Sequence, residues 1–555
     1  MSKSRFITHL YQLRPYVLSG LLFSLSYPSY PWVRLELLAW VCLVPMLLAL
    51  RSVTSFRVMF VLAWVTMFVG CLQTMMWCMW ANPWLIGGFV VVATFILAAP
   101  FAVFGVIQKR LNRRVALWTL PVVWTASDWI HHSLEGTFGG LGFGVTQHKL
   151  TWLIQFIDVT GVWGLTFWLV LMNVAITVAI EEFQARQQSE GEPMARQYLV
   201  RRLALTGAAL LIGPLLYSAW VFSQPERFSN HGQLSVMLVQ PNVNPWVRLT
   251  PELAAQVIGQ TVIATNNAFK SSRPDLIVWP EVAVPSVLLQ NQSDREFLSR
   301  QVRRWNVPLV TGTLDMPSQS PSSSASKSKP RSVWNSSVMV SPERNASGQV
   351  IGTTVSAPYH KQKLMPFFEQ VPLVHWFPSL ERFTSHPATT NRLIPGRRTS
   401  TFSFQTTTQQ TVTVGAPVCY EHFYPQLMAD FVRNGANLLV LLSNDGWFAK
   451  THGEYQIAAF TELRAIETRR AIARCANTGI TCLIDPYGRT CQALPWWQED
   501  VLVGTVPLST RLSVYVRYPD VFPKICVWLT LAVVLGAFRG RAEKTRVRGN
   551  RRDEG

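Results

Sequence analysis

Cys419 has the surroundings of a catalytic nucleophile. It follows the strand-like run 411–418 and precedes a helix expected to begin at Pro425. A turn from a strand into a helix displays a side chain at the edge of a sheet, where a substrate can reach it. A lone buried thiol is more often a packing residue. The polar segment 420–422 favours the functional interpretation, because polar side chains beside an apolar core are unfavourable unless they are paired.

Glu281 and Lys361 are of the types that complete the chemistry of a thiol nucleophile. Glu281 ends the apolar run 276–280. Partial desolvation there would raise the pKa of the carboxyl group and suit it to accept a thiol proton. Lys361 lies in the segment 359–369, and a positive charge can stabilise an oxyanion. Taken singly, Glu281 could equally be a solvated loop residue, and a lysine is usually a surface charge.

The composition indicates a membrane protein. The 555 residues are 49% hydrophobic, which is high for a wholly soluble chain. The formal net charge of +19 comes mainly from short basic runs beside apolar stretches, and this pattern argues against nucleic acid as a partner. The eight cysteines have neither zinc-ribbon nor thioredoxin spacing, so we expect no metal site, no cofactor and no disulfide framework.

Residues 1–223 are expected to form a transmembrane helical domain. A helix of about 20 mostly apolar residues crosses a bilayer, and this part of the chain has seven such stretches between short polar joints. An eighth stretch, 521–538, is followed by a basic tail, 539–555, expected in the cytoplasm. The seven stretches lie near 15–31, 35–50, 58–80, 83–107, 115–131, 152–180 and 203–223.

The positions of lysine and arginine predict the orientation of these spans. In short loops, basic residues mark the cytoplasmic side of a membrane. With eight spans the basic joints all fall on one side, which places residues 224–520 outside the cytoplasm. Apart from Asp128 and Asp158 the spans contain few charged residues, so a transporter or scaffold is a weaker interpretation. The basic joints are the N-terminal arm, Arg51 with Arg57, 109–114, the segment ending at Arg201-Arg202, and 539–552.

Residues 224–520 show the alternating strands and helices of an α/β domain. The segment 316–332, rich in Ser, Pro and Lys, is too polar to fold and is expected to be a mobile loop. Ser293 is expected to cap the N-terminus of one helix, and a long helix is expected over 453–475. The expected strands are 233–240, 275–280, 308–313, 411–418 and 437–443, and the other helices are 251–269, 293–305 and 425–435.

Three motifs occur in order along the chain: Trp279-Pro280-Glu281, Tyr359-x-Lys361-x-x-Leu364-x-Pro366-Phe367-x-Glu369, and Cys419-Tyr420-Glu421. Together they resemble the signatures of the nitrilase, or carbon-nitrogen hydrolase, superfamily and, within it, the apolipoprotein N-acyltransferase family. Segments 155–164, 444–448 and 476–480 resemble the same family, so the resemblance covers nearly the whole chain. Phe368 stands where the family usually has Gly, and its ring is expected to reshape a loop over the site.

The resemblance implies both a fold and a catalytic group. The fold would be a nitrilase-like αββα sandwich inserted between about seven membrane helices before it and one after. The chain would lie in the bacterial inner membrane as a multi-pass protein with a periplasmic catalytic domain. Glu281 would be the general base, Cys419 the nucleophile that forms a thioester, and Lys361 the group that stabilises the oxyanion. The supporting residues would be Glu369, Tyr420 and Glu421.

The reaction implied by the resemblance joins two lipid substrates. An acyl chain would pass from a phospholipid to the thiol, and then to the α-amino group of the S-diacylglyceryl-cysteine of an apolipoprotein. Spanning helices would bring such a site to the membrane lipids. The same triad also serves hydrolysis, so the alternative is a membrane-tethered nitrilase-type amidase with water as acceptor. The aromatic residues expected to line the acyl entry are Trp246, Phe367, Trp447 and Phe448.

Overall fold

The computed structural model of the chain divides into two compact units. One contains Met1–Met79, Pro83–Phe222 and Asp520–Gly555, and the other contains Ser223–Pro519 with the short piece Trp80–Asn82. The expected loop 316–332 lies, over 318–331, outside the described residues, and so does Phe367. The described residues are 3–80, 83–134, 137, 139–247, 250–317, 332–366, 368–371, 376–377, 379 and 392–553.

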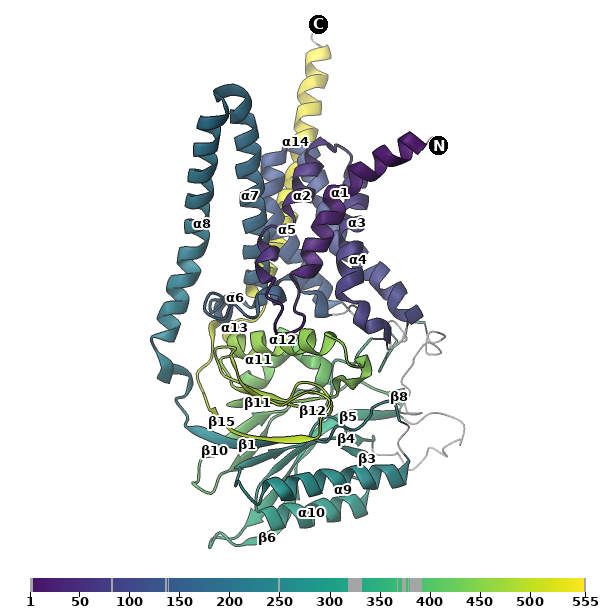
Figure 1. Ribbon diagram of the computed structural model, residues 1–555, viewed down its shortest axis with the longest axis vertical. Helices are drawn as coiled ribbons and strands as arrows, with labels where there is room; N and C mark the ends of the chain where they lie inside the picture. Colours follow the sequence, from purple (N-terminus) through teal and green to yellow (C-terminus); the bar gives the residue numbers. More distant parts are fainter. Residues whose placement is uncertain are drawn as a thin grey trace. The chain divides into compact units, whose positions relative to one another are not determined.

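The first unit is a bundle of long helices (Figure 1). They are α1 (Lys3–Leu25), α3 (Phe56–Thr74), α4 (Pro83–Arg110), α5 (Arg113–Ser133), α7 (Val162–Glu190), α8 (Glu192–Phe222) and α14 (Val521–Asp553). α3 packs against α1 and α4, α5 packs against α4 and α7, and α7 pairs with α8. The α1–α3 contact requires a glycine, because a Cβ at Gly20 would lie 2.5 Å from the carbonyl oxygen of Thr66.

Five helices among the described residues are long and apolar enough to cross a membrane, fewer than the eight spans expected. Residues 35–50, expected as one span, form instead η1 (Glu36–Trp40) and α2 (Val44–Ala49), which are too short to cross. The expected span 152–180 is also divided, because α7 begins only after Gly161, whose φ is +68°. The five helices are Phe56–Thr74, Val90–Arg110, Val162–Ser189, Glu192–Phe222 and Val521–Arg539.

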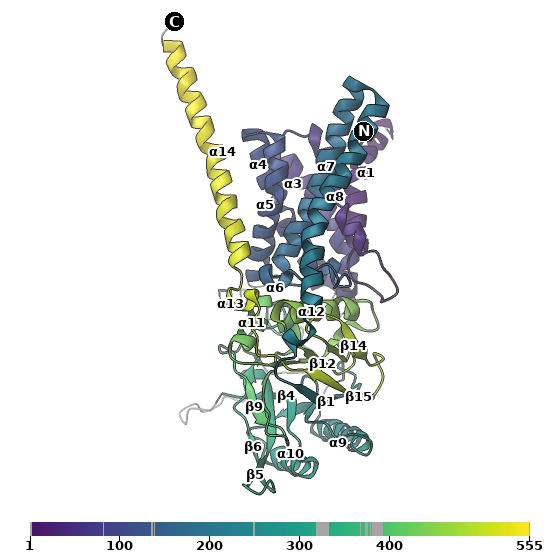
Figure 2. The same ribbon diagram turned by 90° about the vertical axis from the view of Figure 1, so that its left-hand side faces the viewer.

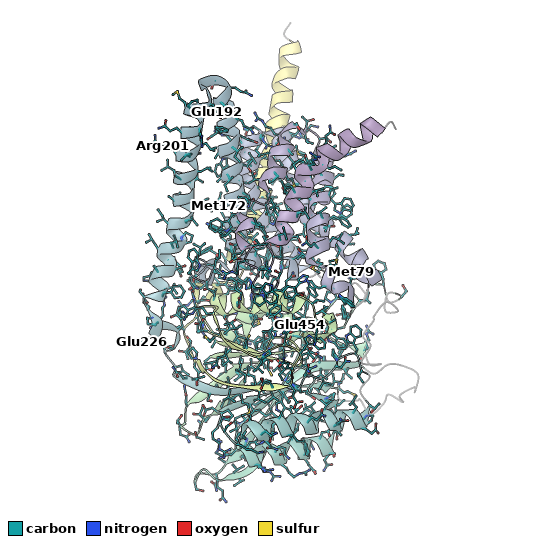
Figure 3. The ribbon with its side chains drawn as sticks, in the orientation of Figure 1. Met79, Met172, Glu192, Arg201, Glu226 and Glu454 are labelled. Carbon is teal, nitrogen blue, oxygen red and sulfur yellow. The ribbon has the colours of Figure 1, made fainter. Side chains whose placement is uncertain are left out.

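Charged side chains gather where α7 turns into α8. Glu192 and Arg201 lie on the first part of α8, whereas Met172 lies on α7 inside the bundle (Figure 3). Glu182 of α7 pairs with Arg114 of α5 at 2.5 Å and with Arg202 of α8 at 3.7 Å. This end of the bundle therefore joins three helices through ion pairs, in addition to apolar contacts.

The second unit contains two β-sheets. In the first sheet the strand order is β15-β1-β2-β4-β5-β6, with β3 beside β4 and with β7 and β8 beside β5. Its strands are β1 (Gln233–Gln240), β2 (Leu276–Val278), β3 (Val284–Val287), β4 (Leu309–Asp315), β5 (Ser332–Arg344), β6 (Val350–Val355), β7 (Tyr359–His360), β8 (Arg392–Leu393) and β15 (Asp500–Pro507).

The second sheet has the strand order β14-β13-β12-β11-β10-β9. Its central strands β10, β11 and β12 are parallel, so their carboxyl ends meet at one edge. The strands are β9 (Phe402–Gln405), β10 (Thr411–Gly415), β11 (Leu438–Ser443), β12 (Ile472–Ala476), β13 (Cys482–Ile484) and β14 (Thr490–Ala493).

Helices cover the outer faces of both sheets, as Figures 1 and 2 show. α9 (Pro251–Ala268) and α10 (Gln292–Trp305) pack on the first sheet, and α11 (Pro425–Arg433) and α12 (Gly453–Thr468) lie on the second. The inner faces meet directly, since Cys475 Sγ donates to the carbonyl oxygens of Val239 at 3.3 Å and Val278 at 3.5 Å. The second unit is thus an αββα sandwich, as expected.

Two local expectations were wrong. The N-cap of α10 is Asn291, whose side chain accepts from the backbone N–H of Asp294, and not Ser293. The helix expected over 453–475 ends at Thr468, because Arg469 adopts a left-handed conformation with φ +52°. The rest of that segment forms β12, which lies between β11 and β13 and whose residues are all buried. Sheet pairing overrides helix propensity there.

Candidate active site

Cys419 lies at the start of a short turn between β10 and α11. Its φ is +49°, an unfavourable value for a residue with a side chain, of the kind that clusters at functional turns. Val418 forms a bridge with Leu442 of β11, which fixes the base of the turn to the sheet. Among the eight cysteines, Cys419 is partly exposed, Cys491 is exposed, and the other six are buried.

Glu281 is held by a close approach between its loop and β4. The Gly312 N–H donates to the carbonyl oxygen of Pro280 at 3.2 Å. A Cβ at Gly312 would lie 2.5 Å from the Val282 nitrogen and 2.7 Å from Glu281 Cα, so only glycine fits there. Val282 itself has φ +51°, which is strained for a β-branched residue. Gly312 therefore determines where the carboxylate lies.

Lys361 follows β7 and is held through its backbone. Its N–H donates to the carbonyl oxygen of Asn335 at 2.8 Å, and its own carbonyl oxygen accepts from Gly396 at 2.7 Å. The ammonium group lies between two buried carboxylates, 3.1 Å from Glu281 Oε1 and 2.9 Å from Glu369. The structure thus brings together Cys419, Glu281, Lys361 and Glu369, as expected from the sequence.

The two carboxylates differ in their affinity for protons. Burial raises the pKa of Glu281, and the positive charge of Lys361 only partly opposes this. Burial acts in the same direction on Glu369, but Lys361 and the backbone N–H of Met365 lower its pKa overall. Burial also raises the pKa of the Cys419 thiol, and the nearby charge of Glu281 adds to the rise. Glu281 is therefore the better proton acceptor, and Glu369 stays ionised.

Lys361 remains protonated in spite of its burial. Desolvation would lower its pKa, but the charges of Glu281 and Glu369 outweigh it and hold the pKa well above the ordinary value. The ammonium group thus provides a fixed positive charge next to the thiol. The ammonium group lies between Glu281 and Glu369, and thus occupies the position from which a metal ion would coordinate both carboxylates.

Glu421 connects the segment that carries Lys361 to the turn that carries Cys419. Its Oε1 accepts from the Tyr359 hydroxyl at 2.6 Å and from the Gln362 N–H at 2.7 Å, and its Oε2 accepts from the Val418 N–H at 2.8 Å. The carboxylate is fully buried. Its contacts are structural, since they reach backbone and side-chain groups on either side of the site.

Asn335 of β5 is a site residue that the sequence did not indicate. Its Nδ2 donates to Glu281 Oε1 at 2.8 Å and to Glu369 Oε1 at 3.1 Å. Its Oδ1 is buried, and within the described residues it has no hydrogen-bond partner. The only signal in the sequence was an amide at a buried position of a strand that follows a Ser-rich segment, and this is a weak one.

A buried polar group behind the thiol was also missed. Ser443 Oγ lies 3.7 Å from Cys419 Sγ and donates to Asp445 Oδ1 at 2.7 Å. The other oxygen of Asp445 accepts from Arg474 at 2.7 Å. The Asn444 N–H also donates to Cys419, which lowers the pKa of the thiol against the effect of burial. Segment 444–448 resembled the family, but its spacing did not indicate this pairing with Arg474.

These groups surround one cavity. Its polar part is formed by Cys419, Glu281, Lys361, Glu369 and Asn335, and its apolar part includes Val247, Val257, Met365, Phe368 and Trp447. Of the aromatic residues expected at the entry, Trp447 lies on the cavity.

The other aromatic residues differ from expectation. Trp246 and Phe448 are not among the described residues that line the cavity; the Trp246 ring contacts that of Trp447, and the Phe448 ring contacts that of Phe368. Tyr420, expected as a supporting residue, is buried against the rings of Phe423 and Tyr424 and is not among the described residues that line the cavity. Tyr420 therefore contributes packing beside the nucleophile.

Two family models match the chain. One is described as carbon-nitrogen hydrolase and covers residues 236–514, and the other is described as apolipoprotein N-acyltransferase N-terminal domain and covers 19–175. The apolipoprotein N-acyltransferase of Chlorobaculum tepidum is 35% identical over 94% of this chain and 95% of its own length. The chain belongs to the apolipoprotein N-acyltransferase family. The member from Geobacter metallireducens is 29% identical over 95% of both chains.

Membership of the apolipoprotein N-acyltransferase family agrees with both units. The N-terminal family model falls within the helical unit, and the hydrolase model falls within the sandwich. The chain is therefore an acyltransferase of the membrane with a nitrilase-type domain.

Proposed function

We propose that this chain transfers an acyl chain from a phospholipid to the α-amino group of an apolipoprotein, through a thioester on Cys419. The observation that carries the proposal is the convergence of Cys419, Glu281 and Lys361 on one partly apolar cavity. A thiol, a carboxylate of raised pKa and a fixed ammonium group are what acyl transfer without a metal ion requires.

In the first half-reaction Glu281 accepts the thiol proton, and the Cys419 thiolate attacks an ester carbonyl of the phospholipid. The ammonium group of Lys361 stabilises the tetrahedral oxyanion. The ester C–O bond breaks, the lysolipid alkoxide takes the proton from Glu281, and the acyl chain remains on sulfur. Glu369 holds Lys361 in place, as their distance of 2.9 Å indicates.

In the second half-reaction the α-amine of a diacylglyceryl-cysteine attacks the thioester. Glu281 accepts a proton from the amine, the C–S bond breaks, and the protonated thiol is restored. The side-chain oxygen Oδ1 of Asn335, a residue that lines the cavity, is buried and has no partner among the described residues, so it is available to accept a hydrogen bond from the incoming amine. The sequence of two transfers is a ping-pong mechanism.

The cellular setting is part of the same proposal. The positions of the basic joints support a multi-pass protein of the bacterial inner membrane with the sandwich on the periplasmic side. Reporter fusions after residues 230 and 510 should then both report the periplasm, and a fusion at the C-terminus the cytoplasm. Opposite sides for 230 and 510 would contradict this orientation.

Mass spectrometry of the intact protein tests the reaction. After incubation with phospholipid, the chain should gain the mass of one acyl group on Cys419, and Cys419→Ala should gain none. A diacylglyceryl lipopeptide with a free α-amine should then remove the adduct and become acylated, whereas the N-acetylated peptide should not. Release of free fatty acid at the same rate without peptide would favour the water-dependent amidase-type reaction instead.

A further inference from the structure

One carboxylate and two imidazoles form a cluster inside the helical unit, separate from the groups that carry the proposed reaction. Asp128, His131 and His132 lie on α5 at positions i, i+3 and i+4, which share one face of a helix. Their ligand atoms all lie within 4.8 Å of one another. The three residues are 3%, 1% and 7% exposed. Buried ionisable groups in a membrane bundle are rare and usually have a function.

His132 is surrounded by hydrogen-bond acceptors. Its Nε2 lies 2.8 Å from the carbonyl oxygen of Gly139, and its Nδ1 lies 2.8 Å from the carbonyl oxygen of Asp128. Asp128 Oδ1 is a further acceptor, 3.5 Å from Nδ1. A neutral imidazole has one N–H, so a ring that donates to Gly139 directs the Nδ1 lone pair at two oxygens. A cation at Nδ1, either a proton or a metal ion, removes this repulsion.

Beside His132, Asp128 and His131 have ligand atoms that accept no hydrogen bond from the described residues. Thr166 Oγ1 donates to Asp128 Oδ2 at 3.0 Å, whereas Asp128 Oδ1 has no hydrogen bond from any described residue. Both ring nitrogens of His131 are buried and have no hydrogen-bond partner in the described ranges. A buried polar group left unpaired destabilises the folded state. The cluster therefore has acceptors in excess, and a cation would satisfy them.

We propose that Asp128, His131 and His132 bind a divalent transition-metal ion of the Zn²⁺ class. One carboxylate and two imidazoles suit this ion, with water as a fourth ligand. In a tetrahedral zinc site the ligand atoms lie roughly 3.3–3.5 Å apart, and the distance of 3.5 Å from His132 Nδ1 to Asp128 Oδ1 already matches this. The bonds from His132 to Gly139 and from Thr166 to Asp128 are the outer contacts that orient metal ligands.

The bound ion would link the C-terminal end of α5 to the segment that follows it and to α7. Gly139 belongs to the segment after α5, and Thr166 belongs to α7. A ligand that binds only the folded state raises the stability of that state. The proposed site is thus structural, and it is independent of the thiol chemistry.

Metal analysis of the full-length protein in detergent tests the proposal. The protein carries a tag without histidine and the substitution Cys491→Ser, which removes the exposed thiol. After treatment with a chelator and addition of Zn²⁺ followed by dialysis, it should retain one zinc per chain and unfold at a higher temperature. His131→Gln and Asp128→Asn should retain none, and Thr166→Val should bind about 10–100-fold more weakly. His231→Gln, in the other unit, is the matched control and should bind as the parent does.

Cobalt provides a measurement that does not depend on variants. Co²⁺ bound to the parent protein should give the visible spectrum of a tetrahedral site with nitrogen and oxygen ligands. A thiolate charge-transfer band, no retained metal, or equal retention by His131→Gln and Asp128→Asn would overturn the proposal.

Discussion

The Tyr359 hydroxyl donates a 2.6 Å hydrogen bond to Glu421, two residues beyond the proposed nucleophile Cys419. Tyr359 begins β7, which leads directly into Lys361. The bond therefore links the segment that carries Lys361 to the segment that carries Cys419. Burial raises the pKa of Glu421, and the hydrogen bonds from Tyr359, Val418 and Gln362 oppose the rise. The contact therefore sets the distance between the charge and the nucleophile.

Glu421→Gln should lower both stability and acylation. The amide places an NH₂ group where the carboxylate now accepts from four donors, and an unsatisfied buried donor costs about 1–3 kcal/mol. Tyr359→Phe removes one of these bonds and should have a smaller effect of the same sign. Denaturant unfolding and the rate of thioester formation measure the two effects. Unchanged acylation in folded Glu421→Gln would show that Glu421 does not position the site.

Gly312→Ala should impair the base and leave the nucleophile intact. The added methyl group overlaps the backbone of Val282 and Glu281, so the loop must move and the carboxylate with it. Displacements of about 1 Å from a productive geometry can cost 10²-fold in rate. Gly259→Ala on α9 is the matched control, because its Cβ meets nothing within 4 Å. Equal acylation rates for the two variants would contradict the role given to Gly312.

The pH dependence of acylation should report Glu281. The carboxylate must be ionised to accept the thiol proton, and burial raises its pKa. As the pH is lowered, activity should therefore be lost around a midpoint that lies above the ordinary glutamate pKa of about 4.3. Asn335 donates to Glu281 and lowers this pKa, so Asn335→Ala should move the acid limb to higher pH. A single-turnover profile of thioester formation measures the shift. A limb that stays in place or moves to lower pH would exclude Glu281 as the base.

Lys361→Ala should retain the fold less well and acylate slowly. Loss of one oxyanion-stabilising group costs on the order of 10²–10³ in rate, and the two carboxylates lose their shared partner. Lys361→Arg should restore activity poorly, because a planar guanidinium does not replace a compact ammonium group. Lys363→Ala is a control that removes a nearby charge which pairs with the Tyr424 ring instead. Similar rates for Lys361→Ala and Lys363→Ala would contradict the proposed role.

Sequence patterns predicted the strands and helices of the sandwich where the hydrophobic periodicity of neighbouring residues is sufficient to define the element. β1 lies over Gln233–Gln240, the range expected, and α11 begins at Pro425, where proline suits the first turn of a helix. β12 was missed because Arg470 and Ile472 fit a helix as well as a strand, and only pairing with β11 decides between them.

The proposed reacting residues could be named from the sequence because three short motifs carry them, but their partners could not. Asn335 and Arg474 reach the site across long separations in the sequence, and no local spacing relates them to Glu281 or Asp445. The expected span over 35–50 was wrong for a similar reason. Apolar composition over 35–50 does not distinguish one crossing helix from two short turns.

The unequal exposure of the eight cysteines makes this protein suitable for active-site titration. Six are buried, so in the native state a thiol-selective reagent meets only Cys491 and Cys419. Replacing Cys491 with Ser leaves a single reactive position, and the fraction labelled then counts competent molecules directly. A phospholipid that forms the thioester protects that position, so the rate at which labelling is lost gives the acylation rate without a radioactive or fluorescent lipid.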